Sequence, residues 1–390
     1  MTLFDGELAD TVLSEEHRML RDETRRFVEN EVRPEARERD PKREHMSREL
    51  IDRMAEMGFF GVLTDEEYDG LGLDLKAYAV IAEELSRGWL SVGSIIARGQ
   101  SLAGATEAQK EDYLAPMARG EKLKAIAISE PEAGSDVASM TSRAERDGDE
   151  YVISGQKMWT TFAEGADFIL VYAVTDPDAE PAYRGISGFI VDKPAGTFDR
   201  EGLSGQPVNK IGYHGWSTWQ VFFDDVRVSA DKLVGSEEGQ GFYQIMEFFE
   251  EGRVHTAARA VGLARGALED SVAYAQEREQ FDRPISDFQA IRFKLADMAT
   301  KTEAARALTL LVADAVDRDE RADAEAAMAK LFASQVAEEV TSEGIQVHGG
   351  YGYTTDFDVE RYWRDARLTR IFEGTDEIQR RIIADRLLSD

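Results

Sequence analysis

The sequence predicts a mainly α-helical chain with a central β domain. Apolar residues recur at helical spacing before about residue 120 and again after Gly241, whereas the stretch between them is rich in β-branched and aromatic residues and in turn signals. The chain has 390 residues, 43% of them hydrophobic, so it can bury substantial cores and is long enough for two or three domains. We expect domains at residues 1–122 (helical), 123–236 (β) and 237–390 (helical).

The N-terminal helices are predicted from amphipathic spacing and from breaks in the chain. Leu20, Phe27 and Val28 share one side of the first helix, which Pro34 is expected to end. Ser47 has the side chain of an N-cap for the next helix. Further helices are expected over residues 49–57, 76–87 and 107–119.

The central β domain is predicted from short alternating or β-branched runs. Gly148 lies in a credible hairpin turn between two of them. The expected strands are residues 125–129, 142–146, 151–154, 168–174, 188–191 and 220–226. No long helix separates them, which is typical of a compact sheet or barrel.

Long helices return after Gly241. Phe242, Ile245, Met246 and Phe249 recur at helical spacing. Helices are then expected over residues 254–274, 287–316, 322–347 and 376–388, with breaks at 278–284 and 349–352.

The charge balance excludes several partners. With 46 basic and 76 acidic residues, the net charge is −30, which disfavours nucleic acid and anionic membrane surfaces. The N-terminus, MTLFDGELAD, shows no secretory leader, and the longest apolar run, residues 168–174, is too short to span a membrane. Without cysteine, the chain cannot carry disulfides, thiolate catalysis or iron–sulfur clusters. We expect a cytoplasmic protein.

The acidic residues are spread along the chain, and only 12 of the 46 basic residues are lysine. A solvated acidic coat of this kind suits concentrated salt, where long-range repulsion is screened. The hypothesis is a salt-adapted source, although an unusually acidic mesophilic protein would have the same composition.

Two segments of the β region could contact a planar, phosphate-bearing ligand. Residues 129–136, SEPEAGSD, could present backbone N–H groups to a phosphate or a heteroaromatic ring, or form only a polar loop. In residues 157–161, KMWTT, Trp159 could stack on a planar ligand while a threonine hydrogen-bonds its edge. The alternative is a tryptophan in the β core.

Two further segments interrupt the C-terminal helices. Residues 278–284, REQFDRP, carry arginine at a helix end, where it could clamp a phosphate pair or lie in a solvated corner. The second segment is QVHGGYGY, residues 346–353, whose glycines permit close approach to a ligand. In the following IFEGT, Glu373 sits among apolar residues, where burial would raise its pKa and let it act as a base. As one carboxylate among many, it could also be surface decoration.

Other chemistries lack their motifs. The five histidines form no HExxH or i, i+4 pair, so we expect no metal site. No Gly-x-Ser-x-Gly nucleophile elbow, Walker loop or GxGxxG fingerprint occurs at these segments.

In this order and at these separations, SEPEAGSD with KMWTT, REQFDRP, QVHGGYGY and RIFEGTDEIQ resemble the acyl-CoA dehydrogenase family over nearly the whole chain. The resemblance implies an N-terminal helical domain, a middle β-barrel and a C-terminal four-helix bundle, assembled as a homotetramer. It implies FAD between barrel and bundle, completed by a neighbouring subunit, with acyl-CoA as substrate and an electron-transfer flavoprotein as partner.

The resemblance also implies roles for matching positions. FAD contacts fall on Ile128, Ser129, Gly134, Ser135, Trp159, Thr161, Arg278, Phe281, Gln346, Gly349, Gly350, Thr375 and Glu377. Substrate contacts fall on Ser135, Arg253, Glu250 and Gly374. Glu373 matches the catalytic base, which would take the α-proton of the thioester while the β-hydride passes to the flavin, leaving a trans-2-enoyl-CoA. Some members carry the base on a bundle helix instead, where this chain has Gly252.

The sequence departs from the family in several loops. Glu132, Phe162 and Asp282 stand where many members have Gly, Asn and Gly, and we expect FAD binding to survive these changes. The stretch 91–105, which helps to shape the acyl pocket in the family, is shorter than usual. Within it, we expect Arg98 to form a surface salt bridge, and the alternative is that it is the partner of a dicarboxylate.

Two other functions remain open on this scaffold. One is an acyl-CoA oxidase, which passes electrons to oxygen; the chain length and the intact IFEGT favour the dehydrogenase. The other is a catalytically silent flavin-binding or scaffold protein, including the nucleic-acid-associated branch, which should lack the base and carry a basic surface. The acyl group is left open by the sequence: straight, branched, aromatic-derived and dicarboxylic thioesters are all compatible.

Overall fold

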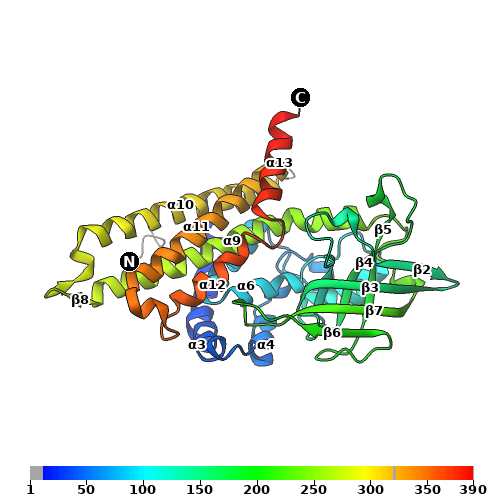
Figure 1. Ribbon diagram of the computed structural model, residues 1–390, viewed down its shortest axis with the longest axis horizontal. Helices are drawn as coiled ribbons and strands as arrows, with labels where there is room; N and C mark the ends of the chain where they lie inside the picture. Colours follow the sequence, from blue (N-terminus) through cyan, green and yellow to red (C-terminus); the bar gives the residue numbers. More distant parts are fainter. Residues whose placement is uncertain (1–11, 319–321, 390) are drawn as a thin grey trace.

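A curled central sheet lies beside a long helical body in the computed structural model, which describes residues 12–318 and 322–389 (Figure 1). This confirms the predicted fold class, a mainly helical chain with a central β domain. The N-terminal segment MTLFDGELAD, in which no secretory leader is expected, lies outside the described residues.

The N-terminal part is helical. Its α-helices and π turns are α2 (Glu15–Phe27), η2 (Val28–Val32), α3 (Arg33–Arg39), α4 (Arg48–Glu56), α5 (Leu75–Gly88), α6 (Leu90–Ile95), α7 (Glu107–Gln109), η7 (Lys110–Leu114) and α8 (Ala115–Ala118). Short 3-10 turns join them at η3 (Asp40–Lys42), η4 (Phe59–Gly61), η5 (Glu66–Tyr68) and η6 (Ile96–Arg98). Ser47 caps α4 as predicted, because its side chain accepts the N–H of Leu50.

The prediction that Pro34 ends the first helix is wrong. The chain runs from α2 through η2 into α3, and Pro34 occupies one of the first two positions of α3. Proline is tolerated there because the wider π turn before it changes the hydrogen-bond partners, so its missing N–H does not break the helix. The helical path therefore continues to Arg39 before the turn η3.

The sheet is built from seven strands: β1 (Lys124–Ala127), β2 (Arg143–Asp147), β3 (Glu150–Thr161), β4 (Phe168–Val174), β5 (Ile186–Asp192), β6 (Leu203–Pro207) and β7 (Thr218–Ser229). Their order is β1-β4-β2-β3-β7-β6, with β5 paired antiparallel to β4. The predicted hairpin turn at Gly148 joins β2 to β3. Strand β6 was not predicted.

The C-terminal part is dominated by three long helices, α9 (Gly241–Glu277), α10 (Gln289–Asp317) and α11 (Asp323–His348). A small hairpin, β8 (Glu279–Gln280) and β9 (Arg283–Pro284), follows α9, and the shorter α12 (Val359–Thr369) and α13 (Asp376–Leu388) pack on α11. In Figure 1 the hairpin lies at the end of the helical body far from the sheet.

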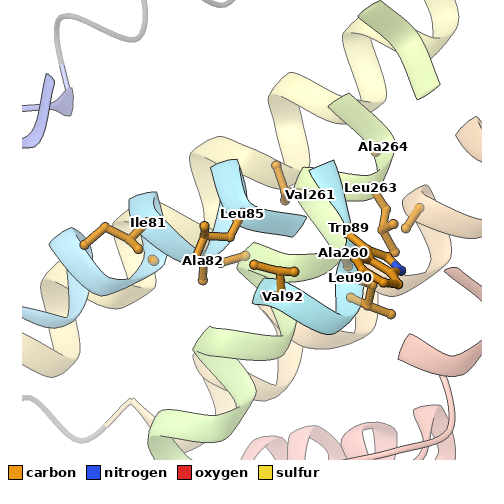
Figure 2. Packing of buried hydrophobic residues seen from close by; sticks show 14 of the residues in the cluster. Ile81, Ala82, Leu85, Trp89, Leu90, Val92, Ala260, Val261, Leu263 and Ala264 are labelled. Carbon is orange, nitrogen blue, oxygen red and sulfur yellow. The ribbon is translucent and has the colours of Figure 1, made fainter. Parts of the chain in front are cut away.

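The N-terminal and C-terminal helices share one hydrophobic core. Leu85 and Trp89 from the α5–α6 region pack with Ala260, Val261 and Leu263 of α9 (Figure 2). Close approach depends on small residues: a Cβ added to Gly262 would lie 2.3 Å from the backbone oxygen of Glu83. Helix α9 therefore holds the first and last parts of the chain together, and both support the site described next.

Candidate active site

Glu373 stands in the short loop between α12 and α13 with a backbone φ of 52°, in the left-handed region. A non-glycine residue rarely adopts this conformation, and such residues cluster at functional sites. The next residue, Gly374, also has positive φ, and its carbonyl accepts hydrogen bonds from Lys330 Nζ at 2.6 Å and Gln379 Nε2 at 3.0 Å. Thr375 then caps α13 by accepting the N–H of Ile378. The turn is thus fixed from α11 and α13.

The Glu373 carboxylate is held by two side chains of α9. Arg259 Nη2 donates to its Oε1 at 2.7 Å, and Thr256 Oγ1 donates to its Oε2. Arg259 is itself buried and also donates to Ser94 Oγ at 2.7 Å and to Thr256 Oγ1 at 2.8 Å. Only 21% of the Glu373 side chain is exposed. A partly exposed carboxylate is therefore oriented by a buried network.

This network lowers the pKa of Glu373, whereas the sequence analysis expected burial to raise it. Burial alone would raise the pKa of Glu373, as the sequence analysis assumed, but the charge of Arg259, with contributions from His255 and the Thr256 hydrogen bond, lowers it below its ordinary value. Glu373 is consequently ionised at neutral pH, the form that a general base needs. The expectation of a raised pKa is wrong because sequence does not show the α9 cation beside the loop.

Aromatic residues connect the Glu373 loop to the sheet. The Phe372 ring meets Tyr213 at 6.2 Å between centroids, Tyr213 meets Trp216 at 5.5 Å, and Trp216 meets Phe162 at 5.7 Å. Phe162 directly follows the end of β3, so this row of rings joins the base to the strand that carries Trp159. A bulky apolar wall of this kind limits the access of water.

Trp159 is turned out of the sheet by a β-bulge. The register of β3 on β7 shifts between Lys157 and Thr160, Trp159 has φ 62°, and its side chain is 58% exposed. The alternative of a core tryptophan is therefore excluded. Its neighbour Thr161 hydrogen-bonds Thr218 at 3.1 Å and is half-buried. The bulge leaves an indole face and a threonine edge available to a planar ligand.

The SEPEAGSD loop is held in place by hydrogen bonds to its buried residue Glu130. Buried Glu130 accepts Lys157 Nζ at 2.8 Å and the backbone N–H groups of Thr141 and Ser142, so the charge of Lys157 and these hydrogen bonds overcome burial and lower the pKa of Glu130 to about 2. Of the predicted contacts, Ile128 and Ser129 are half-buried, whereas Gly134 and Ser135 are exposed. The loop therefore presents its tip to solvent on a rigid base.

The other predicted cofactor residues form a second group, at the far end of the helical body (Figure 1). Arg278, Gly349 and Gly350 line a cavity of about 470 Å³ there, and the Arg278 guanidinium lies 5.5 Å from the Tyr351 ring. Gln346 is exposed one turn before this glycine pair. Phe281, at the tip of the β8–β9 turn, is 88% exposed. One chain therefore does not bring the two predicted groups together.

The remaining predicted positions surround Glu373. A Cβ on Gly252 of α9 would lie 3.6 Å from Glu373 Oε2, so this helix position faces the base. Arg253 follows it and is half-buried, and Glu377 is exposed on the first turn of α13. Glu250 lies in α9, but its side chain is outside the described part.

Two loop departures have a backbone explanation. Phe162 and Asp282 have φ values of 68° and 62°, in the left-handed region that Gly and Asn adopt most easily. The two turns therefore keep a left-handed backbone at Phe162 and Asp282, although these residues adopt it less easily than Asn or Gly.

Sequence reasoning missed Thr256 and Arg259. The available signal was a single arginine in the small-residue run Ala257-Ala258-Arg259-Ala260, because a charge on an otherwise apolar helix face needs a partner.

Comparison with known proteins identifies the family. Three family models match, described as the N-terminal, middle and C-terminal domains of acyl-CoA dehydrogenase, over residues 14–121, 125–226 and 239–388. The chain belongs to the acyl-CoA dehydrogenase family. It is an oxidoreductase, and members of this family depend on FAD.

Individual relatives agree with this assignment. The chain is 41% identical to (2S)-methylsuccinyl-CoA dehydrogenase of Cereibacter sphaeroides over 96% of this chain and 70% of the relative. It is similar to the solved structure of butyryl-CoA dehydrogenase from Megasphaera elsdenii (36% identity, TM-score 0.90, 97% and 99% of the two chains). The chain is also similar to a chain in a solved structure described as the electron transferring flavoprotein of Acidaminococcus fermentans (40% identity, TM-score 0.92, 97% and 99% of the two chains).

The residues present fit FAD. An exposed indole beside a threonine suits the isoalloxazine, and nothing lies within 4 Å of the Cβ positions of Gly134, Gly349 and Gly350, which leaves room for close approach.

No described helix is both long and apolar enough to cross a membrane. Among the described residues, no group of three or more His, Asp or Glu side chains is arranged to hold a metal.

Proposed function

We propose that this acyl-CoA dehydrogenase removes hydrogen from Cα and Cβ of a saturated acyl-CoA, with Glu373 as the base, to give a trans-2-enoyl-CoA. The observation that carries the proposal is the ionised Glu373 carboxylate, oriented by Arg259 and Thr256 and joined through an aromatic row to the strand that bears Trp159. A base fixed between helix α9 and the strand that would face the flavin suits proton abstraction coupled to oxidation.

The chain's own residues would divide the work as follows. Glu373 Oε2 would take the α-proton, and the left-handed turn would keep its carboxylate directed towards the substrate. The α-proton of a thioester is weakly acidic, so the developing enolate needs donors at the carbonyl oxygen, and the Glu373 backbone N–H would be one of them. FAD, when bound, supplies the acceptor for the two electrons that leave with the β-hydrogen. Phe372, Tyr213 and Trp216 would exclude water.

Cofactor binding is proposed to need a second subunit. Trp159 and Thr161 would hold the flavin ring, with Ser129, Gly134 and Ser135 beside it, whereas Arg278 and Phe281 would bind the pyrophosphate and adenosine of a neighbour's FAD. The distance between these groups within one chain, together with the 88% exposure of Phe281, supports sharing between subunits of a homotetramer. Ser135 and Arg253 would contact the CoA thioester, and an electron-transfer flavoprotein would reoxidise the flavin.

The proposed role of Glu373 is tested with Glu373→Gln. Removing the carboxylate should leave FAD bound and yellow but slow anaerobic flavin bleaching by acyl-CoA by about 10²–10⁴-fold, the usual contribution of a general base. Glu132→Gln is the matched control, because it removes an exposed carboxylate from the SEPEAGSD loop. Bleaching of Glu373→Gln at a rate near that of the unaltered enzyme would refute the assignment.

The oxidase is separated from the dehydrogenase by the electron acceptor. After anaerobic reduction, a dehydrogenase should reoxidise slowly in air and rapidly with electron-transfer flavoprotein, whereas an oxidase should reoxidise rapidly in air alone. A silent flavin-binding protein would bind acyl-CoA without any bleaching.

A further inference from the structure

Arg98 carries a positive charge that interacts with Glu373. It lies at the end of η6, and its guanidinium makes no hydrogen bond or ion pair with any described residue; its Nε is completely buried and unsatisfied. The expectation of a surface salt bridge is therefore wrong. Each of the other described arginines that has a buried, unsatisfied nitrogen also pairs with a carboxylate, so Arg98 is the exception. Burial lowers the pKa of Arg98, but a guanidinium stays charged in proteins, so the charge is left uncompensated.

A second unsatisfied donor faces the same place. The Arg98 guanidinium carbon lies 5.3 Å from the centre of the Trp216 ring, and Trp216 Nε1 is also buried without an acceptor. Buried N–H groups usually have a partner, so two unsatisfied donors on side chains in contact offer a place for the acceptor of a ligand. An arginine fork beside an indole N–H matches the two oxygens of a carboxylate.

Two cations, Arg259 and Lys124, interact with Arg98 through their charges, and the acidic residues of this region are Glu373 and Glu251, of which Glu251 acts on Lys124. Glu373 interacts with Arg98 through its charge but is already paired with Arg259. Burial and the charge of Arg98 lower the pKa of Lys124 to about 7. Lys124 Nζ donates to the carbonyls of Gln100 and Ser101, and these hydrogen bonds fix the segment that follows Arg98. An incoming anion would therefore be attracted here, and the donors are held in place before it arrives.

The position of Arg98 relative to Glu373 indicates which part of the substrate would carry the negative charge. Trp216 belongs to the aromatic row that leads to Phe372, next to Glu373, so the orphan donors and the base share one wall. We propose that Arg98 and Trp216 Nε1 bind a carboxylate at the distal end of the acyl chain, and that the substrate is the CoA thioester of a short dicarboxylic acid. This inference rests on the proposed function and names its substrate class.

The test compares thioesters that differ only at the distal group, on the FAD-bound enzyme. Glutaryl-CoA is paired with pentanoyl-CoA, and methylsuccinyl-CoA with 2-methylbutanoyl-CoA, with anaerobic flavin bleaching as the readout. We expect kcat/KM for at least one dicarboxylic thioester to exceed that of its neutral partner by about 100-fold or more. Arg98→Met should abolish this preference mainly through KM, and Arg98→Lys should restore part of it. Arg48→Met, an exposed arginine, is the matched control.

Thermal unfolding keeps the test informative if catalysis is altered. Because Arg98 has no hydrogen-bond or ion-pair partner among the described residues, Arg98→Met should leave the Tm of the ligand-free enzyme unchanged or higher, whereas a structural arginine would lower it. Preference for the neutral thioesters, unaltered by Arg98→Met, would overturn the inference and leave the proposed function standing. If no thioester bleached the flavin, the proposed reaction would be refuted, and binding measured by calorimetry would then test Arg98 separately. Tighter binding of the dicarboxylic thioesters that is lost in Arg98→Met would support Arg98 as the residue that binds their carboxylate. Equal affinity for the dicarboxylic and the neutral thioesters would overturn the inference.

Discussion

Replacing Arg259 by methionine removes the cation that ionises the base while keeping a long side chain. Arg259 Nη2 is 2.7 Å from Glu373 Oε1, so the pair is worth about 6 kcal/mol at an effective dielectric constant of about 20, before the cost of desolvation. Loss of one partner from a buried pair costs about 3–5 kcal/mol. Because Glu373 can respond by taking up a proton, we expect the free energy of unfolding to fall by about 3 kcal/mol at neutral pH.

The loss should depend on pH in a defined direction. In the unaltered enzyme the folded-state pKa of Glu373 is lowered, so its stabilisation is present above the unfolded pKa and is lost as pH falls through the folded value. In Arg259→Met, burial dominates and the folded pKa rises, so Glu373 destabilises the fold as pH increases. The difference in stability should therefore be greatest at neutral pH and smallest in acid.

Activity should follow the same titration. Measured as kcat/KM for anaerobic flavin reduction, the acid limb of the pH profile should move to higher pH in Arg259→Met, because the base must lose its proton first. Arg259→Lys, which keeps the charge, should leave the limb nearer its original position. An acid limb in Arg259→Met that coincides with that of the unaltered enzyme would refute the coupling between Arg259 and the base.

Three further predictions concern separate features. Gly252→Glu combined with Glu373→Gln should recover at least ~10-fold of the activity lost in Glu373→Gln, because residue 252 faces the carboxylate position at 3.6 Å; no recovery in stopped-flow reduction would contradict this geometry. Phe281→Ala should weaken FAD retention, measured by dialysis, with normal folding by circular dichroism; full retention would exclude Phe281 from the cofactor site. If the acidic coat reflects salt adaptation, Tm should rise with salt concentration; an equal or higher Tm in dilute buffer would reject it.

The sequence revealed most of the fold because the periodicity is strong where elements are long. Strand β4 and helix α13 occupy the predicted ranges. Strand β6 was missed because Leu203–Pro207 is polar and glycine-containing, and it is defined by pairing with β7 rather than by its own pattern. Helix α12 was not predicted because it is short and begins soon after a glycine-rich break, although its buried residues recur at helical spacing.

The candidate site was only partly predictable for a different reason. Glu373 belongs to a local motif, but its partner Arg259 is 114 residues away, and nothing in the sequence specifies that pairing. The exposure of Trp159 depends on a bulge against β7, which alternation does not show. For Arg98, the decisive fact is a missing partner, and only the packed structure reveals that.

The core shared by α5, α6 and α9 has a consequence for how the protein is made. Trp89 and its neighbours leave the ribosome long before Ala260 and Leu263, which bury them, and the whole sheet is synthesised in between. The N-terminal helices must therefore wait with their apolar face uncovered, a state that favours aggregation or chaperone binding. Ribosome-bound fragments ending before α9 should be sensitive to protease in the N-terminal helices, and resistance should appear only once α9 has emerged.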